Sequence, residues 1–362
     1  MKIITVLGTR PEMIKLSQVI KKIDENPNVN HILVHTGQNF TKELKDFFFT
    51  DLKLRDPDYY LNINTSSYGD EVSDIIKKTH ELFIKEKPDQ LLILGDTYSC
   101  LSIMPAASLN IKIFHMEAGL RAWDKRMPEQ RNRILIDHMS DVLLPFNQYH
   151  RENLIRENIH PSKIFVTGNP TFEVLRNFQI QIDNSNIVEK LNLIPKKYFL
   201  LTFHRSENVD NPAILERVIL SLNEISKEYG YKIVYPVHPR TKKKLKNLNL
   251  KLENFILIDA LGYYDYNSLT KNSFCILSDS GTAPEEGLLY KIPSVTIRDT
   301  SERYEVVESG LNIVSGTSFD SIKLSISSIT HSSKLFKYDL ESENSPSDVV
   351  LNILLSNFKH YF

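Results

Sequence analysis

The sequence predicts an α/β protein that contains two doubly wound parallel sheets. Short apolar runs rich in β-branched residues recur along the chain and alternate with segments of helical periodicity, which is typical of parallel strands buried on both faces. The 362 residues correspond to two or three domains of about 150 residues each. The runs number about a dozen, too many for one sheet and a poor fit to a (β/α)8 barrel with its eight strands and roughly 250 residues.

The expected strands fall into two groups. Those of the first half span residues 2–7, 31–35, 91–94, 111–115, 141–145 and 164–167. Those of the second half span residues 198–203, 231–237, 255–259, 273–277 and 294–297. Gly168 and Pro170 mark the connection between the two groups, because glycine and proline punctuate regular structure. We therefore expect two Rossmann-like domains, one over residues 1–170 and the other over residues 171–345.

The last stretch of the sequence, residues 346–362, predicts a helix. Ser345 is a suitable N-cap residue and Pro346 suits the first helical position. Apolar residues follow at helical spacing on one face, namely Val350, Ile353, Leu354 and Phe358. We expect this face to pack back on the N-terminal domain.

The composition argues against several classes of protein. Lys and Arg number 44 and Asp and Glu 45, so there is no overall basic field to hold nucleic acid or an anionic membrane. Cys100 and Cys275 are too few and too far apart for a disulfide scaffold or a cysteine metal site. No stretch approaches the roughly 18 apolar residues of a membrane span, and the first residues do not resemble a signal peptide. We expect a cytoplasmic protein with no nucleic-acid partner and no membrane insertion.

Carboxylates follow successive strands of the first half. Asp96 and Glu117 come directly after two expected strands, and Glu129 lies in the first turn of the helix that starts at Pro128. One such carboxylate is usually a helix cap or an ion-pair partner. Parallel strands, however, end at the same edge of a sheet, where ligands bind. Three carboxylates at that edge indicate general acid–base chemistry, since like charges in one cleft shift each other's pKa values.

The first strand ends in Gly8-Thr9-Arg10-Pro11-Glu12, with Lys15 one turn into the following helix. This stretch is not G-x-G-x-x-G, so no dinucleotide fingerprint is present. A helix N-terminus with Arg10 and Lys15 nearby suits an anion, although the stretch is equally compatible with a plain helix start.

The second half places polar groups after its own strands. His204 follows the first of them, and Ser280, Gly281 and Thr282 form a turn before a helix, where backbone N–H groups suit a diphosphate. Glu286, one turn further on, suits ribose hydroxyls. Motifs of zinc hydrolases, serine hydrolases and P-loop NTPases are missing from the sequence.

Taken in order, the motifs between Gly8 and Arg303 resemble those of the non-hydrolysing UDP-N-acetylglucosamine 2-epimerase family. They are GTRPE, TGQ, GDT, HMEAGLR, PEQRNR, TGNP, HRSEN, HPRT, SDSGT and IRDTSER. Any one of them is weak evidence, but the ordered set is specific and covers most of the chain. The resemblance implies a GT-B fold, with a UDP-sugar substrate in the cleft between the two domains, a homodimer, and neither a cofactor nor a metal.

The resemblance also assigns roles to residues. It implies that Asp96, Glu117 and Glu129 are the catalytic carboxylates and that His204 is an essential histidine facing the diphosphate. It implies substrate contacts at Arg10, Lys15, Tyr266, Ser280, Gly281, Thr282, Glu286 and Arg303. Among these, Tyr266 takes the place of an aromatic residue near the uracil, and Leu261 stands where the family often has Gln.

The implied reaction interconverts UDP-GlcNAc and UDP-ManNAc for surface polysaccharide precursors. UDP leaves anti to the C2 proton, 2-acetamidoglucal forms, and UDP adds back. Residues 38–40 and 122–127 depart from the plain UDP-GlcNAc enzymes and look more like relatives that act on a UDP-2-acetamido-2,6-dideoxy-L-hexose or on UDP-2,3-diacetamido-glucuronate. A 2-epimerase of such a modified sugar, a hydrolysing 2-epimerase that releases ManNAc, a GT-B glycosyltransferase and a UDP-sugar sensor are the alternatives.

Overall fold

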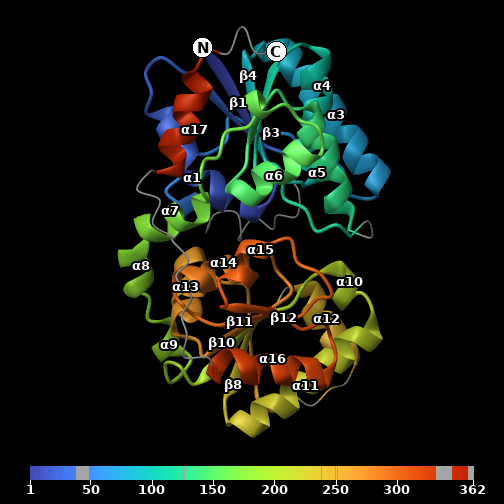
Figure 1. Ribbon diagram of the computed structural model, residues 1–362, viewed down its shortest axis with the longest axis vertical. Helices are drawn as coiled ribbons and strands as arrows, with labels where there is room; N and C mark the ends of the chain where they lie inside the picture. The colour runs from blue at the N-terminus through green and yellow to red at the C-terminus, as the bar shows by residue number, and fades with distance from the viewer. Residues whose placement is uncertain are drawn as a thin grey trace. The chain divides into compact units, whose positions relative to one another are not determined.

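The computed structural model describes the backbone of residues 1–37, 49–124, 127–237, 239–248, 250, 252–331 and 345–357. Contacts group the chain into two compact units (Figure 1). Unit 1 is Met1–Val174 with Glu341–Phe362, and unit 2 is Leu175–Leu340. Of the stretches discussed above, residues 38–40, 125, 126, 238 and 358 lie outside the described residues.

Unit 1 is built on a six-stranded parallel sheet of order β3-β2-β1-β4-β5-β6. Its strands are β1 (Lys2–Leu7), β2 (Asn30–His35), β3 (Tyr59–Tyr60), β4 (Gln90–Leu94), β5 (Lys112–Met116) and β6 (Val142–Leu144). Its helices are α1 (Arg10–Asp24), α3 (Tyr68–Glu86), η1 (Tyr98–Ser102), α4 (Ile103–Ser108), α5 (Pro128–Met139), α6 (Gln148–Arg156), η2 (Pro161–Lys163) and α17 (Pro346–Leu355). The boundary between the units falls inside α7 (Pro170–Asn177).

Unit 2 has a parallel sheet of the same size, in the order β12-β11-β10-β7-β8-β9. Its strands are β7 (Tyr198–Thr202), β8 (Lys232–Pro236), β9 (Phe255–Ile258), β10 (Cys275–Ser278), β11 (Ser294–Thr296) and β12 (Asn312–Val314). Its helices are α8 (Gln179–Asp183), α9 (Ile187–Lys190), α10 (Ser206–Val209), α11 (Pro212–Tyr229), α12 (Pro239–Asn247), α13 (Tyr263–Asn272), α14 (Thr282–Leu289), α15 (Tyr304–Glu308) and α16 (Phe319–His331).

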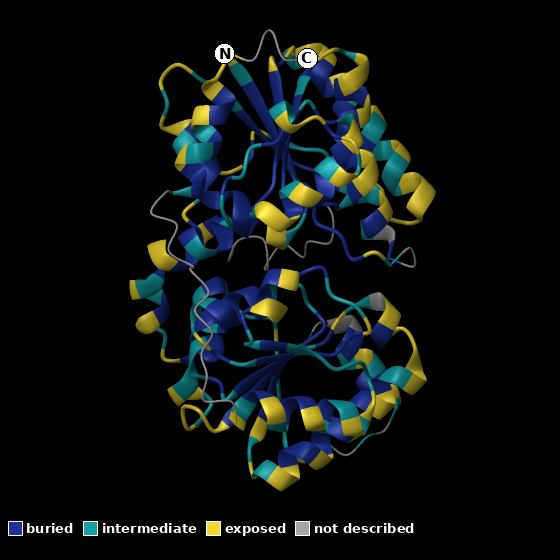
Figure 2. Ribbon diagram, viewed as in Figure 1, coloured by how far each residue is buried: buried dark blue, intermediate teal, exposed yellow. Residues whose placement is uncertain are grey.

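Each sheet lies at the core of its unit, with helices on both faces. Figure 2 shows the central strands as buried and the outer turns of the helices as exposed. All five residues of β4 are buried, and so are the last five of β1. Strands that are covered on both faces read as continuous apolar runs rather than as an alternating pattern. The α/β fold with two parallel sheets is therefore confirmed.

Helix α17 packs in unit 1 against α1. Its N-cap Ser345 accepts a hydrogen bond from the backbone N–H of Asp348, and Lys22 of α1 pairs with the Asp348 carboxylate at 2.7 Å. At the other end, Gln90 Nε2 donates to the carbonyl oxygen of Leu354 at 2.9 Å. Because these contacts reach both α1 and β4, the C-terminal helix is part of the core of unit 1.

The strands differ from the sequence prediction in three places. Strands β3 and β12 were not predicted, because β3 has only two residues and the polar Asn312 opens the short strand β12. The predicted strand over 164–167 is wrong: Ile164 alone bridges to Leu143, although Thr167 N–H still donates to Pro145 O at 3.0 Å. The next bridge of the ladder would need a backbone N–H on Pro145, and proline has none.

Candidate active site

The carboxyl edge of the sheet in unit 1 carries the predicted carboxylates on sharp backbone turns. Gly95, with a φ of +83°, leads from β4 to Asp96, and Glu117 itself follows β5 with a φ of +64°. A residue with a Cβ is strained in this left-handed region. The strain at Glu117 sits at the position where the sequence predicts chemistry, which is where such strain tends to be found.

Two buried cations hold these carboxylates. Lys15 Nζ donates to Glu117 Oε2, and Arg133 Nη2 pairs with Asp96 Oδ2. Arg133 Nη2 also lies 4.0 Å from Glu117 Oε1, so that one guanidinium faces both carboxylates. All four side chains are buried. The structure thus brings together three of the predicted site residues, Asp96, Glu117 and Lys15. Arg133, which faces both carboxylates, was not predicted.

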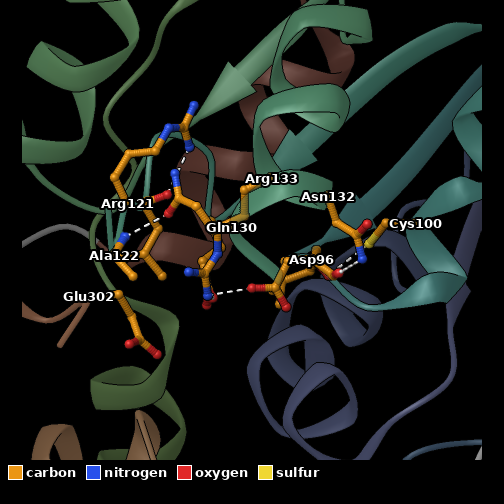
Figure 3. Close-up of polar contacts among 12 residues, drawn as sticks. Asp96, Cys100, Arg121, Ala122, Gln130, Asn132, Arg133 and Glu302 are labelled. Atoms are coloured by element: carbon orange, nitrogen blue, oxygen red, sulfur yellow. Dashed lines mark hydrogen bonds and ion pairs between the residues drawn. The ribbon is translucent and has the colours of Figure 1, made fainter. Parts of the chain in front are cut away.

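Helix α5 supplies the polar contacts that fix this edge (Figure 3). Asn132 Nδ2 donates to the backbone oxygen of Asp96 at 2.9 Å, and Gln130 Oε1 accepts from the N–H of Ala122 at 2.7 Å. Glu129 lies in the first turn of α5, four residues before Arg133 and hence on the same helix face. This spacing is the signal that could have singled out Arg133 among the arginines of this stretch.

A further buried carboxylate, Glu12, ties the first two loops of the edge together. It accepts hydrogen bonds from the backbone N–H of Gly8 and Thr9 at 3.0 and 2.7 Å, and from the Thr97 hydroxyl at 3.0 Å. Burial raises the pKa of Glu12, although its hydrogen bonds act in the opposite direction. Because Thr97 directly follows Asp96, Glu12 links the start of α1 to the turn that carries Asp96. Arg10 is half-buried at the start of α1.

The carboxyl edge of unit 2 is organised by Asp279, which sequence reasoning missed. This carboxylate is fully buried and accepts from the backbone N–H of His204 at 3.0 Å, from that of Arg205 at 2.9 Å and from Asn208 Nδ2 at 3.1 Å. The His204 side chain is 52% exposed, and its Nδ1 lies 3.9 Å from Asp279. Asp279 therefore fixes the turn that carries His204 and leaves the imidazole accessible.

The turn between β10 and α14 holds the predicted diphosphate residues. Ser280 Oγ accepts from the N–H of Thr282 at 3.2 Å, which closes the turn. A Cβ on Gly281 would lie 2.8 Å from Glu302 Oε1, so a side chain at this position would displace the Glu302 carboxylate. Glu302 in turn bridges two arginines, Arg205 at 3.3 Å and Arg298 at 3.0 Å.

Three other predicted residues of unit 2 are buried around this turn. Arg303 Nη1 pairs with Glu285 Oε1 at 3.1 Å, which places a guanidinium beside α14. Glu286 of α14 is 3% exposed. Tyr266 packs in an apolar cluster with Tyr198 and leaves 7% of its surface accessible. Their contacts to a substrate stay predictions.

The part of the chain that the structure describes lacks membrane-spanning helices and metal-binding clusters. None of its helices is at once long and apolar enough to cross a bilayer. Within the same residues, no group of three or more His, Cys, Asp or Glu side chains is placed to hold a metal ion.

Two Rossmann-like units with polar groups at the carboxyl edges of both sheets define a GT-B-like α/β enzyme. A family model described as UDP-N-acetylglucosamine 2-epimerase matches residues 21–345, and the chain belongs to this family.

Relatives of known name cover nearly the whole chain. A UDP-N-acetylglucosamine 2-epimerase of Methanococcus maripaludis is 37% identical, over 99% of both chains. A UDP-2,3-diacetamido-2,3-dideoxy-D-glucuronate 2-epimerase of Pseudomonas aeruginosa is 36% identical, over 89% of this chain and 90% of its own. Among solved structures, the Methanocaldococcus jannaschii UDP-GlcNAc 2-epimerase in complex with UDP-GlcNAc and UDP is 36% identical and superposes with a TM-score of 0.92, over 98% of this chain and all of that one.

Proposed function

We propose that the protein is a non-hydrolysing UDP-N-acetylglucosamine 2-epimerase that interconverts UDP-GlcNAc and UDP-ManNAc. The observation that carries this proposal is the pair of buried carboxylates, Asp96 and Glu117, that share Arg133 at one sheet edge in a chain of this family. The M. jannaschii enzyme of similar structure binds UDP-GlcNAc and UDP, which supports the choice of substrate. The product serves surface polysaccharide synthesis in the cytoplasm, and the reaction needs no cofactor and no metal.

The residues of the two edges divide the reaction between them. Epimerisation removes the C2 proton from one face of the sugar and returns a proton to the other, so two carboxylates on different strand ends suit it. Asp96, Glu117 and Glu129 are the candidates for these transfers, and each positioned group contributes about 10²–10⁴-fold. In unit 2, His204 and Arg303 stabilise the negative charge that develops on the departing diphosphate.

The direct test is ¹H NMR spectroscopy of UDP-GlcNAc with the purified protein in D₂O. We expect UDP-ManNAc to form with deuterium at C2, because the proton that returns comes from a group in exchange with solvent. Free ManNAc and UDP would identify a hydrolysing enzyme instead. A substrate that keeps its C2 proton and does not change would contradict the proposal for UDP-GlcNAc.

A second candidate function is 2-epimerisation of a modified UDP-sugar. The P. aeruginosa relative acts, by its name, on a 2,3-diacetamido glucuronate, and its identity to this chain is similar to that of the M. maripaludis enzyme. Incubation of the protein with UDP-2,3-diacetamido-glucuronate under the same conditions separates the two candidates. The true substrate is the one with the higher kcat/KM.

We also propose that the protein acts as a homodimer. In unit 1, α4 packs against both α3 and α5, and these helices carry exposed apolar side chains, namely Ile84, Met104, Ile134 and Leu135. Exposed apolar side chains on neighbouring helices support association with a second copy. Light scattering should give twice the mass of the chain, and Met104→Glu should give the mass of one chain.

A further inference from the structure

A buried histidine of β5, His115, is the subject of this inference. Its side chain is completely inaccessible. Nδ1 lies 2.8 Å from Asp137 Oδ1, and Nε2 lies 2.8 Å from the carbonyl oxygen of Gly95. His115 is not among the residues to which the proposed mechanism gives a role, yet both of its ring nitrogens are occupied at the edge that carries Asp96 and Glu117.

The two partners determine where the ring carries protons. A carbonyl oxygen can only accept a hydrogen bond, so Nε2 carries a proton. Burial raises the pKa of the Asp137 carboxyl, but its hydrogen bond to His115 and the charges of His115 and Arg121 outweigh burial and hold this pKa below the ordinary value. Asp137 is therefore an ionised acceptor, and the ring is held between this carboxylate and the Gly95 carbonyl.

The Asp137 carboxylate that holds the ring is itself paired within unit 1. Arg121 Nη2 pairs with Asp137 Oδ2 at 2.7 Å, and the same guanidinium binds both oxygens of Glu157, at 2.7 and 2.6 Å. His138 of α5 lies 3.5 Å from Glu157. Arg121 thus bridges two carboxylates. A charge in a dry core persists only when it is paired and hydrogen-bonded in this way.

The network reaches both catalytic turns through the backbone. His115 binds the carbonyl of Gly95, and the next residue is Asp96. Asp137 accepts from the N–H of Gly119 at 3.1 Å, two residues after Glu117. A Cβ on Gly119 would lie 2.1 Å from a backbone oxygen of α6, so this turn also packs closely against α6.

We propose that His115 is a positioning residue which ties the turn of Asp96 to the turn of Glu117 through Asp137. Catalysis then depends on a group that does not touch the substrate. The kinetic consequence rests on the proposed epimerase function, whereas the effect on the two turns does not.

The chain contains a matched control on the same sheet. His31 of β2 also pairs with an aspartate, with Nδ1 2.6 Å from Asp24 Oδ1 and a buried side chain. Its Nε2 faces the hydroxyl of Thr5 at 2.9 Å, a side chain of β1 rather than a backbone group of a turn at the carboxyl edge. His31 is paired with Ile3 near the amino ends of the strands, away from the catalytic edge.

The first experiment compares the backbone ¹H–¹⁵N NMR resonances of the intact wild-type protein with those of His115→Gln and His31→Gln. The amide resonances of Asp96 and Gly119, which lie on the two turns, should shift in His115→Gln and stay in place in His31→Gln. Unchanged resonances in His115→Gln would overturn the proposal. This measurement stays decisive even if the protein proves inactive on UDP-GlcNAc.

The second experiment compares the kinetics of His115→Gln with those of His31→Gln. Misplacement of catalytic groups by about 1 Å costs about 100-fold, so kcat of His115→Gln should fall by about this factor while KM changes less than about 3-fold. His31→Gln should retain kcat even if it lowers the melting temperature. Equal kcat values for the two variants, or a change confined to KM, would contradict a positioning role. If His115→Gln does not fold, the pair Asp137→Asn and Asp24→Asn, which alters the same two contacts from the aspartate side, is compared in the same way.

Discussion

The carboxyl edges of the two sheets use ion pairs in opposite ways. In unit 1 the groups proposed for chemistry are carboxylates, and cations support them: Lys15 holds Glu117, and Arg133 holds Asp96. All of these side chains are buried, so each carboxylate has a fixed orientation.

In unit 2 the roles are exchanged. The groups proposed for binding are the cations, and buried carboxylates support them: Glu302 bridges Arg205 and Arg298, and Glu285 holds Arg303. The imidazole of His204 is half exposed. Together with the proposed function, the comparison predicts that proton transfer depends on the carboxylates of one edge, whereas diphosphate binding depends on the cations of the other. Variants at the two edges should therefore affect kcat and substrate affinity differently.

The largest expected effect is at the edge of unit 1. Asp96→Asn and Glu117→Gln keep the shape of each side chain but remove its capacity to take a proton. We expect kcat to fall by about 10²–10⁴-fold, while UDP, measured by calorimetry, binds as in the wild type. Asp141→Asn is the matched control, because Asp141 accepts from the Ile113 N–H at the opposite end of β5. If both variants stayed fully active, the proposed acid–base role would be wrong.

Asp279→Asn should give a smaller loss at the edge of unit 2. An asparagine has one acceptor oxygen and one NH₂ group, and the NH₂ group would face backbone donors that now point at a carboxylate. Leaving a buried donor unsatisfied costs about 1–3 kcal/mol. We expect this loss in the free energy of unfolding by urea and a weaker affinity for UDP. The surface variant Asp259→Asn, which affects only an exposed ion pair with Lys242, should show neither change.

Gly281→Ala should weaken substrate binding, with a smaller effect than that of Asp279→Asn. The new methyl group would contact Glu302 and displace it from between its two arginines, so we expect KM for the UDP-sugar to rise about 10-fold, equivalent to about 1.4 kcal/mol. Gly69→Ala is the control, since its Cβ would meet only a hydroxyl at 3.9 Å in α3. A KM that is the same in both variants would contradict a role of this turn in binding.

The smallest effect is expected at the C-terminal helix. The hydrogen bond from Lys22 lowers the pKa of Asp348, although burial acts in the other direction. The stabilisation is therefore present above the ordinary aspartate pKa of 3.8 and is lost as the pH falls through the lowered value. Because both side chains are exposed, Asp348→Asn should cost less than about 1 kcal/mol. Urea unfolding at neutral pH should show this small difference, and at pH 2 the variant and the wild type should unfold alike.

The sequence was sufficient to predict where the carboxylates of the site lie. Asp96 and Glu117 follow strands of strong apolar pattern, and the geometry of parallel sheets places such positions at one edge. Sequence alone did not identify their partners. Lys15 and Glu117 are 102 residues apart, and only the phase of α5 distinguishes Arg133 from Arg131.

The supporting residues of the second unit were missed for a related reason. Asp279 and Glu302 stood inside motifs, but their importance comes from the donors that converge on them from other loops. Convergence of this kind depends on tertiary packing, which no local pattern encodes. The strands β3 and β12 were missed because they carry little apolar pattern. The segment 164–167 was assigned wrongly because the sequence does not show that it pairs beside Pro145, which has no backbone N–H to continue the ladder.

Pro145 also has a consequence for how the protein behaves at high concentration. The strand β6 is the last of its sheet, and the outermost strand of a sheet can recruit a strand from another molecule through its free backbone groups. The chain from Ile164 to Thr167 runs along β6, and the missing N–H of Pro145 stops the two from forming a continuous ladder. A regular seventh strand would present an unbroken row of donors and acceptors to other molecules. The proline thus protects this margin of the sheet against aggregation.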